Sequence, residues 1–114
     1  MAKYLFEANY VGEGTKALLK DGGTARVEVA KKLMQSLGGS LESFYFAFGD
    51  IDAFIVAELP DDASAAAAAL TASASGAVKI NTRVLITPGE IDAAGKLGVE
   101  YTPPGARRIG RKRA

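Results

Sequence analysis

The strongest constraint on the fold is the order in which strand-like and helix-like patterns follow one another. Four short runs are rich in aromatic and β-branched residues and largely alternate as strands do, and longer helical patterns separate the first run from the second and the third from the fourth. Only a Gly49-Asp50 turn joins the second and third runs, which is typical of a β-hairpin. The predicted order is therefore β-α-β-β-α-β, the split βαβ arrangement.

The boundaries of these elements come from local signals. Strands are predicted at residues 3–10, 41–48, 53–59 and 78–86, and helices at 13–20, 24–37 and 63–75, with a short terminal helix that starts at Pro88. We expect Thr24 to cap the second helix and the Asp61-Asp62 pair to open the third. The predicted fold is α+β and ferredoxin-like, an antiparallel sheet with its helices on one face.

The length of the chain predicts one domain, and the charge distribution sets its C-terminal residues apart from the rest. The 114 residues fit a single domain, which we place at residues 3–101, followed by a mobile Pro/Gly-containing and basic tail at 102–114. The tail holds five of the 14 basic residues, which leaves nine against 13 acidic residues in the rest of the chain. The body is therefore no nucleic-acid binder by charge, and only the tail offers such a contact, the alternative being a solvated end.

Two absences narrow the chemistry. The chain has no cysteine and no histidine, so thiol catalysis, thiolate metal sites, haem ligation by histidine and the usual neutral-pH general base are excluded. We expect no metal and no cofactor. The sequence shows neither a secretory leader pattern nor an apolar stretch near the roughly 20 residues of a membrane span, which predicts a cytoplasmic protein with no membrane contact.

Apolar side chains on both faces of the predicted sheet indicate a partner. One face is expected to pack on the helices, and the other to carry Leu5, Phe44, Phe46, Phe48, Phe54, Val56 and Leu85. A sheet face in contact with water should read as polar, and an apolar patch of this size is unusual on a monomer. We expect a second copy of the chain to cover it in a homodimer or larger assembly. The alternative is that the terminal helix and tail fold back over it.

Four polar residues are candidates for ligand binding. Tyr4, Tyr10 and Tyr45 are predicted on the helix-facing side, where their hydroxyls could polarise a small ligand, or where they are simply core rings. Arg26 follows a Gly22-Gly23 break at a helix start and could hold an anion, the alternative being a solvated arginine.

Asp52 is the candidate catalytic residue. It lies beside aromatic residues at the end of the hairpin turn, where desolvation would raise its pKa towards that of a general base. An aspartate in a tight turn also accepts backbone N–H bonds and so fixes the hairpin. Both interpretations stay open from the sequence alone.

The central part of the chain resembles a known family. The run SLGGSLESFYFAFGDIDAF, which begins at Ser36 and is followed by IVAELPDD, resembles the GYD domain family, as do the starting KYLFEANY and the later GAVKINTRVLIT. The likeness covers about residues 3–97. Gly49 and Asp52 match the Gly-x-Tyr-Asp turn, whereas Ile51 stands where the family has tyrosine. The resemblance implies a dimeric α+β barrel and no particular activity.

Two functions are consistent with these observations. The first is a small homo-oligomeric domain that binds a small apolar ligand or serves as an assembly unit. The second is a cofactor-independent enzyme, monooxygenase- or isomerase-like, acting on a small aromatic or lactone-like substrate, with Asp52 as base, Tyr45 or Tyr10 as polariser and Arg26 as anion holder. The second is suggested only by analogy with related barrels of the same fold.

Overall fold

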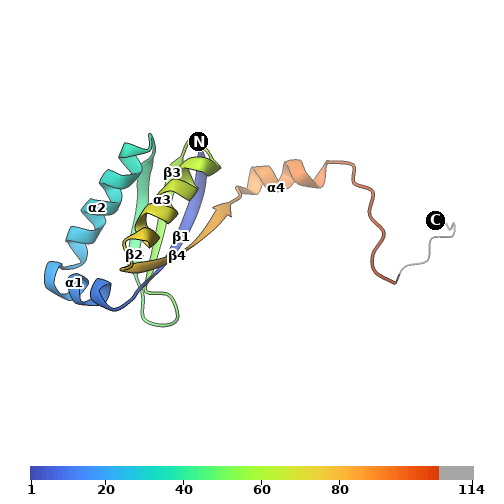
Figure 1. Ribbon diagram of the computed structural model, residues 1–114. Helices are drawn as coiled ribbons and strands as arrows, with labels where there is room; N and C mark the ends of the chain where they lie inside the picture. The colour runs from blue at the N-terminus through green and yellow to red at the C-terminus, as the bar shows by residue number, and fades with distance from the viewer. Residues whose placement is uncertain (106–114) are drawn as a thin grey trace.

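The computed structural model places a four-stranded antiparallel sheet beneath three helices and extends the chain beyond them as an arm (Figure 1). The structure describes residues 1–105, so most of the predicted basic tail, residues 106–114, lies outside the described residues. None of the helices within residues 1–105 has the length and apolar character needed to cross a bilayer.

The strands pair in the order β2-β3-β1-β4, with every neighbouring pair antiparallel. This confirms the predicted ferredoxin-like α+β fold and the order of its elements. The elements are β1 (Ala2–Tyr10), α1 (Glu13–Asp21), α2 (Gly23–Ser36), β2 (Ser40–Phe46), β3 (Ala53–Leu59), α3 (Asp62–Ala74), β4 (Val78–Leu85) and α4 (Pro88–Gly95).

The core lies between the sheet and the helices α2 and α3. Alternate residues of β1 and β3 are buried on this helix-facing side, since the side chains of a strand point to its two faces in turn. On α3 the buried positions are Ala65 and Ala68, whose small side chains let the helix lie close to the strands. The buried apolar residues are Tyr4, Phe6, Ala8, Met34, Ala53, Ile55, Ala57, Leu59, Ala65, Ala68 and Val78.

Helices α3 and α2 are capped at their N-termini in two different ways. Asp61 caps α3, where one carboxylate oxygen accepts hydrogen bonds from the backbone N–H and the hydroxyl of Ser64, both at 2.8 Å. These bonds favour the ionised form and hold the pKa of Asp61 below its usual value. The prediction that Thr24 caps α2 is wrong. The cap position is Gly22, whose φ of 89° lets the chain turn sharply between α1 and α2 without a side-chain cap.

Strand β2 turns its side chains the opposite way from the prediction. Phe44 pairs with Ile55 and Phe46 with Ala53, so both phenylalanines lie on the helix-facing side, and Tyr45 pairs with Phe54 on the other. A bulge between Leu41 and Ser43 is the cause, because one extra residue moves every later side chain to the opposite face. Phe44 and Phe46 therefore do not belong to the predicted partner face, and Tyr45 does not belong to the helix-facing side.

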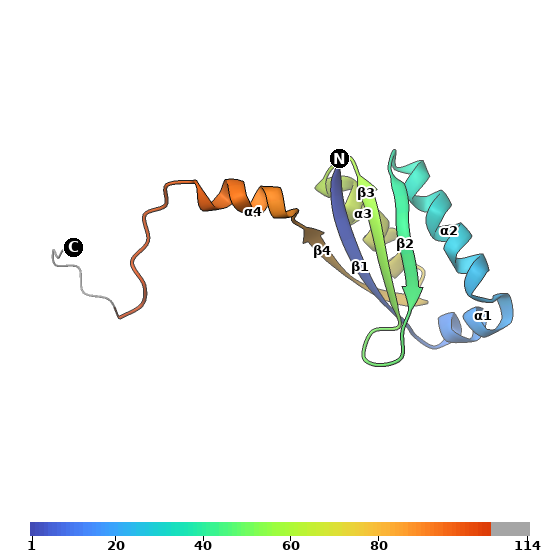
Figure 2. The ribbon, with the colours of Figure 1, turned by 180° about the vertical axis from the view of Figure 1, so that it is seen from behind.

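The sheet face opposite the helices, hereafter the outer face, carries apolar side chains interspersed with charged ones. Leu5, Phe54, Val56 and Leu85 lie there as predicted, joined by Tyr45, which is 70% exposed. Phe48 lies in the β2–β3 loop and is fully exposed. The charged side chains are paired: the Lys3 ammonium donates to Glu42 at 2.6 Å, and Nε of Arg83 donates to Glu7 at 3.0 Å. In the strand register Glu7 lies beside Phe54, and Arg83 lies beside Leu5. Figure 2 shows this face without a covering helix.

The chain after β4 leaves the body as an arm, residues 86–105 (Figures 1 and 2). Helix α4 starts at Pro88 as predicted and has a complete capping box, in which Thr87 and Glu90 exchange side-chain and backbone hydrogen bonds of 2.9 and 3.1 Å. The helix points away from the sheet, so the alternative in which it folds back over the outer face does not hold for the described residues.

Candidate ligand site

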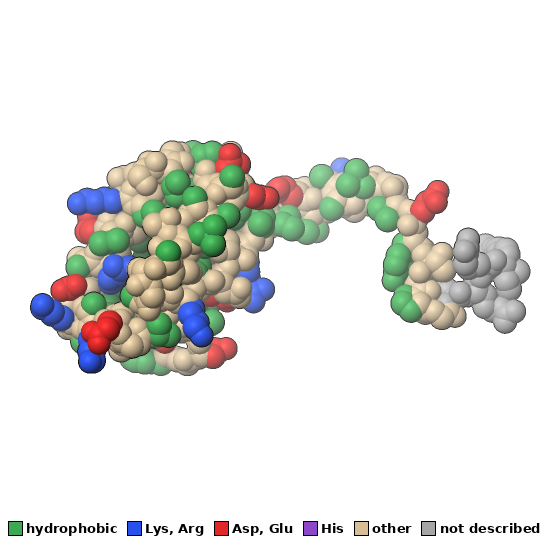
Figure 3. All heavy atoms as spheres, viewed as in Figure 1, with side chains coloured by type: hydrophobic (Ala, Val, Ile, Leu, Met, Phe, Trp, Pro, Cys, Tyr) green, Lys and Arg blue, Asp and Glu red, His purple; other side chains and the backbone are tan. Residues whose placement is uncertain are grey.

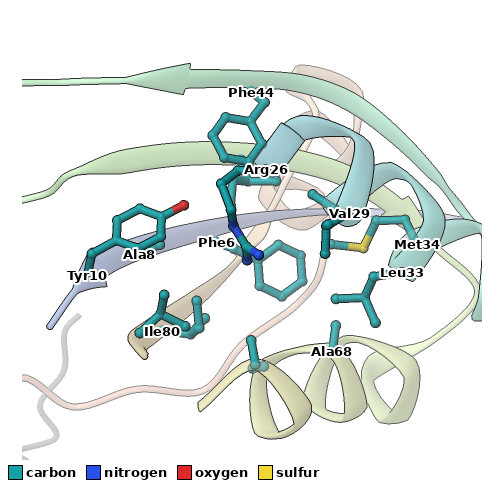
Figure 4. A pocket seen from close by; sticks show the side chains of 15 residues that line it. Phe6, Ala8, Tyr10, Arg26, Val29, Leu33, Met34, Phe44, Ala68 and Ile80 are labelled. Atoms are coloured by element: carbon teal, nitrogen blue, oxygen red, sulfur yellow. The ribbon is translucent and has the colours of Figure 1, made fainter. Parts of the chain in front are cut away.

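A small apolar cavity lies between the helix-facing side of the sheet and helices α2 and α3 (Figure 4). We call it the inner cavity, and its volume is about 60 Å³. The one charged side chain that lines it is Arg26. The others are Phe6, Ala8, Tyr10, Val29, Ala30, Leu33, Met34, Phe44, Ile55, Ala68, Ala69, Ala72, Val78 and Ile80.

Helix periodicity explains why an arginine faces this cavity. Arg26 occupies the first turns of α2, and Val29, Ala30, Leu33 and Met34 follow at spacings of three and four residues. Residues so spaced share one face of a helix, and here that face packs on the sheet. Arg26 is half-buried and takes a position in the sheet-facing stripe of α2 that an apolar residue would normally hold.

The guanidinium group of Arg26 is incompletely satisfied. Its Nε atom is buried and has no hydrogen-bond partner among the described residues. The salt bridges within residues 1–105 do not include Arg26 either. A buried donor without a partner costs free energy. The inner cavity is therefore lined by an arginine whose buried N–H donor still lacks a hydrogen-bond acceptor.

A larger groove, the entrance groove, adjoins the inner cavity and opens to solvent. Its volume is about 350 Å³, which falls in the range of small-molecule sites. Tyr10, Arg26, Val29, Leu33, Ala72 and Val78 line both spaces, so the groove leads into the cavity past the guanidinium. Asp21, Thr71 and Ser75 supply polar groups to the groove.

Tyr10 is the predicted tyrosine that reaches this site. Figure 4 shows its ring and hydroxyl on the same side of the sheet as the Arg26 side chain, with the ring of Phe6 beyond. Its ring centroid lies 6.4 Å from that of Phe46. Two of the predicted ligand residues, Tyr10 and Arg26, therefore line the same cavity. A ligand in this cavity would contact a cation, a phenol and apolar walls.

The other two predicted tyrosines lie elsewhere. Tyr4 is buried, and its hydroxyl donates a 2.6 Å hydrogen bond to Asp62 at the start of α3. This bond and the loss of water around the ring raise the pKa of Tyr4 to about 12. Tyr4 therefore ties β1 to α3 as a core residue, while Tyr45 lies on the outer face.

Asp52 fixes the end of the hairpin. Its carboxylate accepts a 2.9 Å hydrogen bond from the backbone N–H of Tyr10, and its own N–H donates to the carbonyl of Ala8 and the side chain of Asn9. It lines a separate open groove of about 410 Å³ together with Tyr10 and Phe46. Among the residues of the enzyme hypothesis, Asp52 and Arg26 therefore line different spaces, Tyr10 lines both, and Tyr45 lines neither.

Sequence reasoning misses most of the walls of the cavity. It places Phe44 on the wrong face, and it predicts a helix over residues 63–75 without placing Ala68, Ala69 and Ala72 at a cavity. The three-and-four spacing of Arg26 with Val29 and Leu33 is a signal that would have placed the arginine inward.

Within residues 1–105, no three of the side chains that usually bind metals gather at one place.

The comparisons with known proteins agree with the fold. The GYD domain family model matches residues 4–94, which is most of the chain. The chain therefore belongs to the GYD domain family. No curated protein and no solved structure matches it.

Proposed function

We propose that this member of the GYD domain family is a homo-oligomeric binding protein for a compact apolar ligand that carries one anionic group. The observation that carries the proposal is the buried Nε of Arg26, which lacks a partner among the described residues and lies in a cavity whose other walls are apolar or aromatic. An anion at this point would supply the missing acceptor, and a charge-assisted bond to arginine is among the stronger hydrogen bonds.

The size and shape of the two spaces define the ligand class. The inner cavity of about 60 Å³ admits only a small apolar group, and the entrance groove of about 350 Å³ holds the rest of the molecule. The guanidinium lies where the two spaces meet. We therefore favour a small aromatic or alicyclic carboxylate whose charged group binds Arg26 and whose ring contacts Tyr10 and the apolar walls.

The homo-oligomeric part of the proposal is supported by the outer face. It carries the apolar side chains of Leu5, Tyr45, Phe54, Val56 and Leu85, and the charged side chains among them are neutralised in ion pairs. Apolar and aromatic side chains with few unpaired charges are typical of a protein interface. This face lies opposite the ligand site, so assembly leaves the entrance groove open.

Calorimetric titration with matched probes tests the ligand. We expect benzoate and cyclohexanecarboxylate to bind and the neutral amides of the same rings to bind roughly tenfold more weakly or not at all, since only the carboxylates offer a charge to Arg26. Arg26→Met should remove this preference. Lys32→Met, on an exposed part of the same helix, is the control and should behave as the unmodified chain.

The same variant has a second readout that does not need a ligand. Arg26→Met keeps the aliphatic stem and deletes the unpaired charge, so the free protein should be at least as stable to denaturant as the original. A preference for carboxylates that survives in Arg26→Met, or equal binding of acids and amides, would contradict the proposal.

A further inference from the structure

The arm is the part of the described chain with the least support from its own molecule. Ile86, Ile91, Leu97, Val99 and Tyr101 are each more than half exposed, and Val99 reaches 77%. Figure 3 shows hydrophobic side chains along a segment that stands clear of the body. An eight-residue helix such as α4 is marginal in water without packing, so its capping box and Pro88 prepare a helix that still needs a surface.

We propose that the arm of one copy packs on the outer face of a second copy, and that the second arm does the same in return. The inference rests on the homo-oligomeric part of the proposed function and adds to it which segment makes the contact. The exchange is reciprocal, so one two-fold arrangement covers both apolar surfaces that the isolated chain leaves exposed.

The area of the outer face favours participation of the arm. Full burial of one aliphatic or aromatic side chain removes roughly 60–120 Å² of apolar surface from water. Leu5, Phe54, Val56 and Leu85 are already partly buried in the single copy and only Tyr45 is largely exposed, so the face has at most roughly 250 Å² of apolar side-chain surface left to bury. A standard protein interface buries about 800 Å² of total surface per partner, of which somewhat more than half, about 450 Å², is apolar. The five exposed side chains of the arm add roughly 200–400 Å², which brings the total into that range.

The position of the arm also favours a second copy. The arm leaves β4 directly after Leu85, which lies on the outer face, and it runs outwards instead of returning to that face. In a two-fold pair built on the outer face, the arm of each chain therefore starts beside the interface.

Two single substitutions in the full chain test the contact. Leu97→Asp places a charge on the arm, and Tyr45→Asp places one on the outer face at a side chain already largely exposed, so the core is left intact in both. Each variant should raise the dimer dissociation constant roughly tenfold or more in sedimentation equilibrium. Lys96→Asp places the same carboxylate at a polar position of the arm, with an even larger change in charge, and serves as the control, with dimerisation retained.

Mixing the two variants distinguishes arm-on-face contact from other dimers. The arm of the Tyr45→Asp chain is intact, as is the face of the Leu97→Asp chain, so the mixture should form heterodimers in native mass spectrometry in excess of either homodimer. A Leu97→Asp chain that dimerises like the original would overturn the inference. So would a monomeric original chain whose arm binds anionic vesicles instead.

The ligand readout is independent of this outcome. Benzoate binding at Arg26 should be unchanged in both variants, because neither residue lines the inner cavity or the entrance groove. Loss of the dimer result with retained benzoate binding would remove the arm contact alone, whereas loss of benzoate binding in the original chain would remove the proposed ligand.

Discussion

The body, residues 1–85, and the arm, residues 86–105, both contain apolar side chains, but they differ in how far their own chain shields these side chains from water. In the body, Tyr4 and Leu59 are almost fully enclosed by the sheet and helices of the same chain. In the arm, Leu97 and Tyr101 are mostly exposed although the local helix signals are complete. Local sequence is thus enough to build an element, and only tertiary contact gives its apolar side chains a stabilising environment.

The largest expected effect comes from one substitution made in both regions. Leu59→Ala should lower the free energy of unfolding by about 2–5 kcal/mol, since it leaves a cavity at a fully enclosed site. Leu97→Ala should change it by less than about 0.5 kcal/mol when measured on the dilute, dissociated chain. Urea unfolding followed by circular dichroism provides both values. Similar losses at the two sites would mean that the arm packs on its own body.

A pair of glycines sharpens the same comparison. A Cβ at Gly14 would lie 2.0 Å from the carbonyl oxygen of Ala77, so Gly14→Ala must displace backbone and should cost at least about 1–3 kcal/mol. A Cβ at Gly95 would meet no atom within 4 Å, and alanine favours helix, so Gly95→Ala should raise the helicity of α4 without destabilising the body. Thermal unfolding and α4 chemical shifts report the two effects. A neutral Gly14→Ala would contradict the close approach of α1 to the turn before β4.

The smallest effect concerns the pH dependence of the body. The pKa of Tyr4 is raised to about 12 by its bond to Asp62, compared with about 10 for an unfolded tyrosine. The folded state therefore holds this proton more tightly, and the resulting stabilisation is complete below pH 10 and is lost as pH rises towards 12. Tyr4→Phe should flatten the fall in stability across this window. An unchanged slope between pH 10 and 12 would show that the bond is not formed in solution.

Most of the body is predictable from the sequence because its patterns are unambiguous there. In β1 and β3 alternation separates the two faces, and the Asp61 cap and alanine-rich run define α3. Residues 44–48, which include the end of β2, are all apolar or aromatic, so the sequence alone does not choose the sheet face on which each side chain lies. In the structure the bulge before Ser43 decides it. Arg26 could be named as an anion holder, but the cavity beside it depends on three elements that meet only in the fold.

The arm shows the opposite limit. Its start at Pro88 is predictable from local signals, whereas its direction depends on contacts that the local sequence does not encode. Phe44 and Phe46 no longer support the prediction that the apolar sheet face needs a partner, because they lie on the other side of the sheet. The exposed apolar side chains of the arm support a second copy instead.

Hydrogen exchange of the α4 amides tests the central claim most directly. If a second copy receives the arm, the amides from Ile91 to Gly95 should exchange slowly at high protein concentration and approach the rate of an unstructured peptide on dilution, while the amides of β1 stay protected throughout. Exchange of α4 at the unprotected rate at every concentration would contradict the account, because the arm would then have no partner surface.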